Sequence, residues 1–547
     1  MRRSLLAAFT AATALTATLP LALSTPAASA GTGGGEREPW VVRSAVMRAD
    51  AKEFRSLCGK PKEGKPERRT FPLFRHGKGF TAVQDFRRKD ANGTVYWGGH
   101  DPKIPENTIS VSVIGACNGG PVTLSGAIDG GFRQYQYAPT VKRSGGYVLT
   151  EIDSLALPPN GHGVDTVDVP ARKPHKPHKP HKPGVRIATP ENPAAIDIVV
   201  AYTPASVAEL GSVAAVQGRI TCGVNQLNRA LATSGVPASV HVVNTYQTQT
   251  TGVPRENAGT LLGMLSNPAN QVLGAPAATA RSTYSADLVA LLATIPAEDS
   301  SGQANLPTPA AAPTTDSAAF SVTSVFSVTA WENLAHEIGH NFGLVHDRAT
   351  VVNEGGTTPP NTANYGFITA DQQHHTIMAY SSACAQPCKV VNQYSALENL
   401  FNGQAVGDEN NNNAATATRS ADILAAYRPT RVTNRVSLNL ASSPVAGAAS
   451  LKPSEYGPYD PGVQVTVTAT PNPGFQFTGW LVDGVAQTVT TPSTIRVSPE
   501  PCAARNAAAG SRPGREVRSG PGQFIACVPI TPSSRSRSAA SLPGAAV

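Results

Sequence analysis

The sequence has 547 residues, a formal net charge of +8 and seven cysteines. A chain of this length is too long for one ordinary domain, so we expect about three. The basic total does not favour a nucleic-acid partner, because residues 187–429 carry 8 basic and 17 acidic side chains and are net acidic. We therefore expect no nucleic-acid partner.

The first residues have the pattern of a secretory signal peptide. Arg2 and Arg3 precede an uncharged, apolar run from Leu5 to Leu23, and Ala28-Ser29-Ala30 supplies small residues for a signal peptidase. A transmembrane anchor is the alternative, but Thr residues and Pro20 interrupt the run. We predict that residues 1–30 are removed, that no segment spans a membrane, and that the protein is secreted and extracellular.

Residues 31–170 are predicted to form a β-rich domain. Alternating runs such as Thr108 to Ile114 and Tyr147 to Ile152 are separated by Gly and Asn turn residues. The stretch 171–190 then repeats Lys-Pro-His three times from Lys173. Proline at every third position excludes a helix and favours an extended linker. Its histidines could bind a transition metal, but a stiff spacer open to proteases is the simpler interpretation.

Residues 191–430 show strands that alternate with helices. Apolar residues recur at helical spacing after Val213 and predict a long amphipathic helix that ends near Gly235. Four apolar runs of strand length surround it: Ala195 to Tyr202, Val240 to Val243, Ala286 to Leu292 and Phe320 to Phe326. This alternation indicates an α/β domain.

Residues 431–500 are predicted to form a small β domain. Val436 to Leu440 and Val463 to Ala469 alternate in the manner of strands. Three aromatic residues would share one face of the next strand: Phe475, Phe477 and Trp480. Residues 501–547 consist largely of Ala, Arg, Ser, Gly and Pro, a composition typical of a disordered tail.

The strongest chemical signal is the run His336-Glu337-Ile338-Gly339-His340-Asn341-Phe342-Gly343-Leu344-Val345-His346. Histidines four residues apart lie on one face of a helix, so His336 and His340 can direct ring nitrogens at one ion. Glu337 is placed to take a proton from a water that the ion activates. The pattern His-Glu-x-x-His alone is a moderate indication of a zinc site, and Gly343 and His346 at fixed spacing after it make the indication strong. We predict Zn²⁺ bound by the three histidines, with Glu337 as the catalytic base.

The spacing also requires a sharp turn after the helix. If the helix continued to residue 346, the third histidine would point away from the ion. Gly343 is the residue that accepts the positive φ of such a turn.

The stretch from Ala335 to Asp347 resembles the active-site motif of metzincin zinc metallopeptidases, and Asp347 resembles the reprolysin (adamalysin-like) branch. Thr376-Ile377-Met378-Ala379-Tyr380 is similar to the Met-turn of that group, which implies that Met378 packs under the ligands. Reprolysins usually have proline where Tyr380 stands. Astacins and serralysins have tyrosine there, in contact with the zinc or the oxyanion, so Tyr380 is a candidate catalytic helper; a structural hydroxyl is the alternative.

The resemblance is to bacterial secreted reprolysin-like peptidases and runs from about Ile196 to Arg428, while Val463 to Trp480 resembles a small bacterial β-repeat module. It implies a multidomain protein with a β-rich prodomain, an α/β metzincin catalytic domain (a twisted sheet plus the active-site helix) and a C-terminal β module. It also implies a latent proenzyme that is released when the linker is cut.

The cysteines permit three disulfides and one thiol. Cys384 and Cys388 are close enough for a small loop, and the pairs Cys58–Cys117 and Cys502–Cys527 would leave Cys222 free. Cys58 with Gly59 also resembles a cysteine that ligates the zinc in a proform. We favour the disulfide.

These features predict a zinc metalloendopeptidase that cleaves internal bonds of proteins or peptides extended along an edge strand. A thermolysin-like enzyme with a glutamate as third ligand is disfavoured by His346. The alternative from another class is a surface-binding or adhesive protein with an inactive peptidase domain. The β module supports this alternative, because it suggests a contact with a cell surface or a polymer. The intact zinc motif argues against it. Calcium near Asp408 and Glu409 is a further prediction, and a plain Asn-rich loop is the alternative.

Overall fold

The computed structural model describes residues 38–59, 64–74, 79–140, 144–157, 165–170, 193–249, 257–296, 301–308, 316–359, 362–432, 434–436, 438, 440–443, 448–482, 485–488, 491–497 and 523–526. The predicted signal peptide, the Lys-Pro-His linker and the pair Cys502 and Cys527 lie outside these residues.

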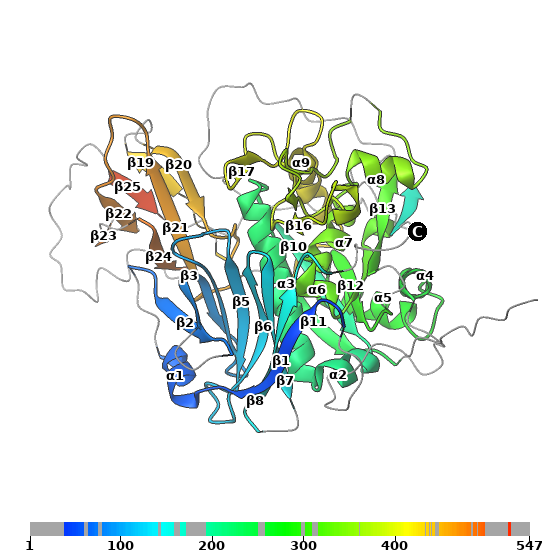
Figure 1. The fold of residues 1–547 in the computed structure, drawn as a ribbon, viewed down its shortest axis with the longest axis horizontal. Helices are drawn as coiled ribbons and strands as arrows, with labels where there is room; N and C mark the ends of the chain where they lie inside the picture. The colour runs from blue at the N-terminus through cyan, green and yellow to red at the C-terminus, as the bar shows by residue number, and fades with distance from the viewer. Residues whose placement is uncertain are drawn as a thin grey trace, which may run out of the picture. The chain divides into compact units, whose positions relative to one another are not determined.

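The N-terminal region is an antiparallel sheet with the strand order β1-β8-β7-β6-β5-β4-β3, and β2 pairs with β3 (Figure 1). Its strands are β1 (Val41–Arg48), β2 (Arg68–Pro72), β3 (Gly79–Lys89), β4 (Val95–His100), β5 (Thr108–Ile114), β6 (Thr123–Gly130), β7 (Arg133–Thr140) and β8 (Gly146–Asp153). Helix α1 (Ala51–Arg55) and the 3-10 turn η1 (Ser56–Cys58) pack on it through Phe54 and Leu57. The alternation in the sequence predicted β5 residue for residue, because one side of each strand faces this core.

The central domain has a mixed sheet with the order β11-β10-β12-β14-β13-β9. The strands are β9 (Thr166–Pro170), β10 (Ala194–Tyr202), β11 (Ala238–Gln247), β12 (Leu288–Ala293), β13 (Gly302–Thr308) and β14 (Phe320–Ser324). The four strands β11, β10, β12 and β14 run parallel, and β13 is antiparallel to β14. Strand β9 belongs to the N-terminal region of the sequence but forms the outer edge of this sheet, parallel to β13.

Helices cover both faces of the central sheet, which explains its nearly continuous apolar strands. Ile198 and Val200 of β10 pack with α3, α7 and α9, whereas Ala201 of the same strand packs with α4 and α5 on the opposite face. The helices are α2 (Pro204–Leu210), α3 (Val213–Thr233), α4 (Ala258–Ser266), α5 (Gly274–Tyr284), α6 (Ser327–Ala330), α7 (Asn333–Asn341), α8 (Arg348–Asn353) and α9 (Asn413–Leu424). The α/β architecture expected for this region is therefore present.

Helix α3 is the long helix that the spacing predicted. Ser212 caps its first turn by accepting from the backbone N–H of Ala215 at 3.1 Å, and Gly235 follows its end with φ 74°. An amphipathic helix normally exposes its polar side. Here that side is covered by the N-terminal sheet: a Cβ on Gly218 would lie 2.8 Å from the Cβ of Ser125. Buried Arg219 donates to Gln136 Oε1 at 3.2 Å.

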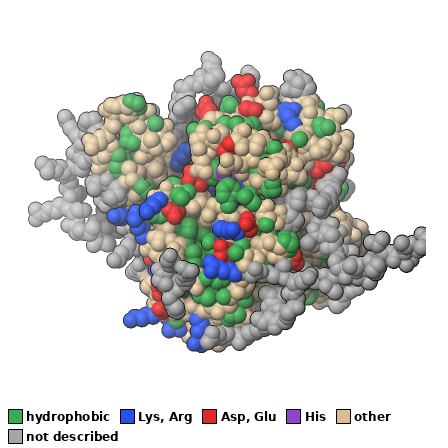
Figure 2. All heavy atoms as spheres, in the orientation of Figure 1, with side chains coloured by type: hydrophobic (Ala, Val, Ile, Leu, Met, Phe, Trp, Pro, Cys, Tyr) green, Lys and Arg blue, Asp and Glu red, His purple; other side chains and the backbone are tan. Residues whose placement is uncertain are grey.

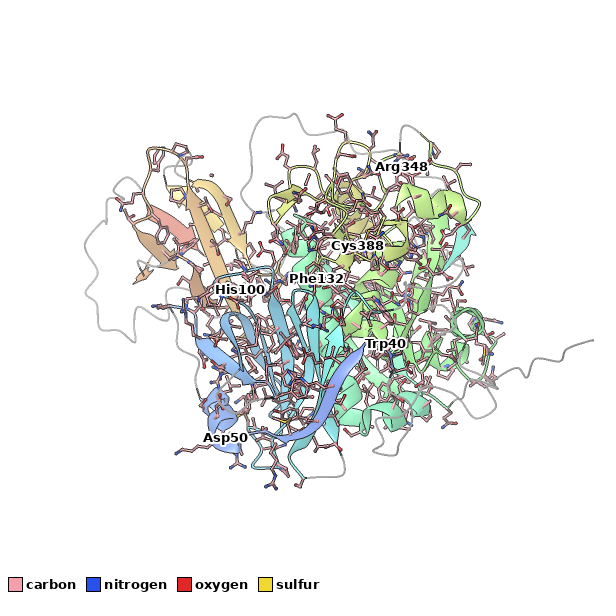
Figure 3. The ribbon with its side chains drawn as sticks, in the orientation of Figure 1. Trp40, Asp50, His100, Phe132, Arg348 and Cys388 are labelled. Carbon is pink, nitrogen blue, oxygen red and sulfur yellow. A yellow bond between two sulfur atoms is a disulfide. The ribbon has the colours of Figure 1, made fainter. Side chains whose placement is uncertain are left out.

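Further contacts hold the N-terminal sheet against the central domain. Arg229 of α3 pairs with Asp85 at 2.6 Å, and Lys389 pairs with Asp129. The ring of Phe132 (Figure 3) stacks on His374 with centroids 5.9 Å apart. On the face drawn in Figure 2, Lys and Arg side chains gather mainly over the N-terminal β region.

The C-terminal region is also β, as expected. Its strands are β19 (Leu440–Ser443), β20 (Ala448–Pro453), β21 (Gln464–Pro471), β22 (Gly479–Val482), β23 (Val485–Thr488), β24 (Ser493–Arg496) and β25 (Gln523–Ala526). Strand β21 extends the N-terminal sheet by pairing Gln464 and Val465 with Arg87 and Phe86 of β3.

Two details of the C-terminal region differ from the sequence prediction. The strand expected from Phe475 begins only at Gly479, so Phe475 is 39% exposed while Phe477 packs on buried Trp480. Strand β25 forms within the stretch for which composition predicted disorder, because β19 and β22 pair with it on either side. Among the described helices none is long and apolar enough to cross a membrane.

Candidate metal centre and active site

Helix α7 carries the first two predicted ligands, and its spacing brings their rings together. The Nε2 atoms of His336 and His340 lie 3.1 Å apart, and both side chains are buried. Their separation of four residues places them on one face of the helix.

The chain reverses after α7 and returns the third histidine to the first two. Gly343 has φ 85°, its N–H donates to His340 O at 2.8 Å, and the N–H of Leu344 donates to Gly339 O at 3.1 Å. This is the glycine-terminated helix end that the sequence predicted. It places His346 Nε2 3.3 Å from that of His336 and 3.2 Å from that of His340.

The other ring nitrogen of each histidine contacts an oxygen and thereby orients the ring. The contacts are His336 Nδ1 to Ile377 O at 2.7 Å, His340 Nδ1 to Leu344 O at 2.8 Å, and His346 Nδ1 to Glu354 Oε2 at 3.0 Å. A proton on each Nδ1 satisfies these oxygens and leaves three Nε2 lone pairs directed at one point, as in histidines that bind metals. Sequence reasoning did not identify Glu354, which lies in the turn after α8.

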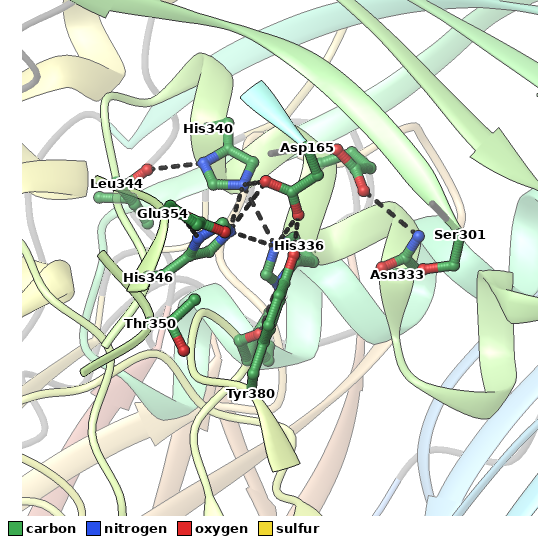
Figure 4. A network of polar contacts seen from close by, with 12 residues as sticks. Asp165, Ser301, Asn333, His336, His340, Leu344, His346, Thr350, Glu354 and Tyr380 are labelled. Carbon is green, nitrogen blue, oxygen red and sulfur yellow. Dashed lines mark hydrogen bonds and ion pairs between the residues drawn. The ribbon is translucent and has the colours of Figure 1, made fainter. Parts of the chain in front are cut away.

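A fourth residue reaches the same point from the N-terminal region (Figure 4). Asp165 lies just before β9 and is buried, with Oδ1 2.9 Å from His346 Nε2 and Oδ2 3.2 Å from His336 Nε2. The hydroxyl of Tyr380 donates to Oδ2. Sequence reasoning missed Asp165, since it lies 171 residues before His336 and no local pattern connects them.

The arrangement of these four residues fits a zinc ion. Zn–N bonds of about 2.0–2.1 Å in a tetrahedron would place two ligand nitrogens about 3.3–3.4 Å apart, close to the 3.1–3.3 Å between the histidine Nε2 atoms. Among the described residues, buried Asp165 Oδ1 and Glu337 Oε2 accept no hydrogen bond. Such atoms are costly unless a cation or a donor approaches them.

Electrostatic effects in the site favour positive charge between the three rings. Burial lowers the pKa of His340 to about 4, which keeps that imidazole neutral as a ligand must be. Burial by itself lowers the pKa of His346, but Asp165 and Glu354 outweigh it and raise the pKa to about 10. Burial likewise opposes the ionisation of Asp165, yet His346 and His340 hold its pKa well below the ordinary range.

Glu337 lies beside the cluster and is not one of its four members. Asn333 Nδ2, one turn earlier on α7, donates to Glu337 Oε1 at 3.3 Å. Gly302 of β13 leaves space for the carboxyl, because a Cβ there would be 2.3 Å from Glu337 Oε1. Burial, reinforced by the charge of Asp165, raises the pKa of Glu337 well above its ordinary value.

The Met-turn residues lie under and beside the histidines. Met378 is buried, and a Cβ on Gly339 would be 2.5 Å from its sulfur, so the glycine between the two histidines of α7 makes room for it. The ring of Tyr380 lies 4.5 Å from that of His346, and burial raises the pKa of its phenol well above the ordinary value.

Asp347, which directly follows the third histidine, connects the Met-turn to helix α8. Its side chain caps α8 by accepting from the N–H of Thr350 at 2.9 Å, and it also accepts from the N–H of Tyr380 at 3.1 Å. Asp347, which the sequence suggested only through its resemblance to the reprolysin branch, therefore helps to position Tyr380 beside the histidines.

The disulfides decide between the two interpretations of Cys58. Cys58 is bonded to Cys117, and Cys384 is bonded to Cys388, as predicted. The alternative in which Cys58 ligates the zinc is wrong, because its sulfur is used in the disulfide. Cys222 is the free cysteine among the described residues and is buried.

The proposed calcium loop has a simpler internal explanation. Asp408 Oδ1 accepts from the N–H of Asn410 at 2.8 Å and from Asn411 Nδ2 at 2.9 Å, and Glu409 is exposed. Calcium binding at this loop stays a prediction.

Three buried histidines around one point beside a buried glutamate are the arrangement expected of a metal-dependent hydrolase. Residues 192–395 match the model of metallo-peptidase family M12 (Reprolysin_5), and residues 439–501 match the divergent InlB B-repeat domain. The M12 match and the cluster of three histidines with an aspartate support a zinc-dependent metalloprotease.

No curated protein matches the chain. One similar solved structure is described as "Structure of a chaperone-substrate complex"; the match has 19% identity and a TM-score of 0.33, and it covers 43% of this chain and 35% of that chain. This chain thus spans about a third of that one, and a likeness at this TM-score does not define a fold.

Proposed function

We propose that this protein is a secreted zinc metalloendopeptidase of the metzincin type, made as a latent proenzyme. The observation that carries the proposal is the convergence of His336, His340 and His346 on one point with the carboxyl of Glu337 beside it. The three histidines would hold the zinc. When bound, zinc polarises a substrate carbonyl and lowers the pKa of a coordinated water.

Glu337 would act as the general base and then as the general acid. Its raised pKa suits both roles, because a carboxylate that holds a proton readily can take one from water and pass it to the leaving amine. Asn333 donates to one oxygen of Glu337 and so leaves the other free to accept the proton.

Tyr380 would stabilise the oxyanion that forms on the substrate carbonyl. The hydroxyl already donates to a carboxylate oxygen at the centre of the cluster, and the raised pKa keeps its proton in place. A preorganised donor of this kind stabilises the transition state more than the ground state.

Strand β13 would bind the substrate in an extended conformation. Asn341 of α7 donates to Asn305 O of β13 at 3.0 Å, so the strand is fixed relative to the catalytic helix. A peptide that pairs along this strand can extend past the site in both directions, which suits cleavage of internal bonds.

Secretion, latency and the function of the C-terminal module extend this proposal. The signal-peptide pattern supports export, and the module's match to a B-repeat supports a contact with a cell surface or a polymer. The adhesive alternative with an inactive peptidase domain is not favoured.

Casein cleavage by the trypsin-treated chain tests the proposal. We expect cleavage to stop with a zinc chelator and to return with added Zn²⁺. Glu337→Ala should lower the rate by about 10²–10⁴-fold, the usual contribution of a general acid–base, whereas Asp422→Ala, at an exposed carboxylate on α9, should leave it unchanged. Full activity of Glu337→Ala would refute the mechanism, and inactivity of every form would favour the adhesive alternative.

A further inference from the structure

A cavity of about 260 Å³ lies between the N-terminal sheet and the C-terminal region, and none of its described lining residues belongs to the metal centre. Its walls are Cys58 and Gly59 at the end of η1, the last three residues of β3, Pro461 and Gly462 in the turn before β21, and Arg496 at the end of β24. Strand β21 pairs with both β3 and β24, which brings these segments together (Figure 1). A water molecule fills about 30 Å³ of the liquid, so the cavity has room for a ligand with several oxygen atoms.

Basic residues dominate the lining of this cavity. Four of its residues are Arg or Lys, and none of the described residues that line it is Asp or Glu. Arg88 pairs with Asp460 at 3.5 Å, so its charge is compensated. Arg87 and Lys89 lie on one face of β3, because alternate residues of a strand point to the same side. Within the described part of the chain, these two residues and Arg496 form no ion pair with a carboxylate.

Arg87 is a buried cation whose charge is only partly compensated. Its side chain is 8% exposed, and its guanidinium donates to Leu57 O and to Gly59 O, the latter at 3.1 Å. Burial lowers the pKa of Arg87, and the charge of Glu67 opposes this, but Glu67 already pairs with Arg69 at 2.7 Å. A buried charge is costly unless a group of opposite charge approaches it. The cavity beside Arg87 is therefore a favourable place for an anion.

The walls of the cavity are fixed before any ligand binds. The disulfide between Cys58 and Cys117 holds the η1 wall. On the other side, Gly462 has φ 88°, its N–H donates to Val497 O at 2.7 Å, and a Cβ there would lie 3.6 Å from a terminal nitrogen of Arg496. Glycine is the residue that adopts this φ readily. Such rigid walls reduce the entropy that is lost on binding.

The chemistry of these cations fits linked phosphate groups. A guanidinium donates through parallel N–H groups to two oxygens of one phosphate, and a lysine ammonium adds a point charge. Residues 31–170 carry 19 basic and 15 acidic side chains, whereas residues 187–429 are net acidic. Lys and Arg also gather mainly over the N-terminal β region in Figure 2. A polyanion is therefore attracted to this part of the molecule rather than to the central domain.

From these observations we propose that the cavity binds the phosphate groups of a polyanion through Arg87, Lys89 and Arg496. The cations belong to different regions, since Arg87 and Lys89 lie on the N-terminal sheet and Arg496 lies in the C-terminal region. A bound polyanion thus stabilises the contact between β3 and β21, and the site is complete only while both regions are present. The inference does not depend on the proposed peptidase activity.

Calorimetric titration with tripolyphosphate tests the proposal in the full-length chain. Every protein carries Glu337→Ala, so that the chain stays intact. The double variant Lys89→Ala/Arg496→Ala removes two exposed cations of the cavity. The matched control Arg48→Ala/Lys103→Ala removes the same charge at two exposed positions that do not line the cavity, and Arg48 lies on β1 at the opposite edge of the N-terminal sheet. Tripolyphosphate also chelates metal ions, but this heat is common to all the proteins.

We expect the double variant at the cavity to bind tripolyphosphate at least about tenfold more weakly than the parent, as the loss of charge-assisted hydrogen bonds does. The control should stay within about twofold of the parent, because distant exposed charges are screened by salt. The melting temperature of the parent should rise with tripolyphosphate more than that of the cavity variant. Lys89→Gln/Arg496→Gln keeps more of each side chain, so it remains informative if the alanine variant folds poorly.

Inorganic phosphate in a parallel titration separates a single anion from linked groups. Binding of tripolyphosphate that is at least about tenfold tighter than that of phosphate supports a site for linked groups, because the three cations can then act on one ligand. Equal affinities for the two probes would overturn the assignment to a polyanion. Equal weakening in the cavity variant and in the control, or no binding by the parent, would overturn the site itself.

Discussion

Gly302 provides a direct test of how β13 positions Glu337, the proposed catalytic base. A methyl group at this position would lie 2.3 Å from Glu337 Oε1, 2.7 Å from its Cδ and 2.8 Å from Asn333 Nδ2. Normal contact needs well over 3 Å, so the carboxyl must move by about 1 Å, a displacement that can cost about 10²-fold in rate. We therefore expect Gly302→Ala to lower kcat/KM by about 10²-fold, or about 2.7 kcal/mol of transition-state stabilisation.

The assay combines peptide hydrolysis with zinc content and thermal melting. Zinc content should be unchanged, because Gly302 contacts the base and its partner rather than a histidine. Gly263→Ala is the matched control: it lies on the exposed side of α4 with nothing within 4 Å of a new Cβ, and it should stabilise the helix by about 1 kcal/mol with full activity. A fully active Gly302→Ala enzyme would refute the position assigned to Glu337.

Three further predictions concern buried groups. Burial raises the pKa of Glu332 to about 8, so folding takes up a proton at this group; its contribution to stability is fully present below about pH 4.5 and is lost as pH rises to about 8. The free energy of unfolding of Glu332→Gln, relative to that of the parent, should therefore increase between pH 5 and pH 8. An equal difference between variant and parent at pH 5 and pH 8 would contradict this. Cys222 is buried and donates to Ser110 O of the N-terminal sheet at 3.3 Å. A thiol reagent should therefore modify Cys222 only after the N-terminal sheet separates from α3. Rapid labelling of the intact chain would contradict the burial of Cys222 between the sheet and the helix. Tyr380→Phe should lower kcat by about 10²-fold, as loss of an oxyanion donor does, with zinc content unchanged; an unaltered kcat would leave the hydroxyl a purely structural role.

The local features of the site followed from the sequence because their causes are local. Helical periodicity places His336 and His340 together, and a glycine with φ 85° is the physical condition for His346 to return. Strands β10, β11, β12 and β14 of the central sheet were predicted for the same reason, since apolar runs such as β12 are buried on both faces, whereas β9 and β13 were not predicted.

The contacts between segments far apart in the chain were decided by the tertiary structure alone. Asp165 and Gly302 meet the motif of α7 only because β9 and β13 pair at the edge of the sheet, and Glu354 reaches His346 only after the turn that follows α8. The polar side of α3 is buried for a similar reason, because the N-terminal sheet supplies hydrogen-bond partners for it. A sequence encodes such pairings through surface complementarity, which has no period along the chain. The histidines and the glutamate of the site were therefore predictable, and the carboxylate that faces them was not.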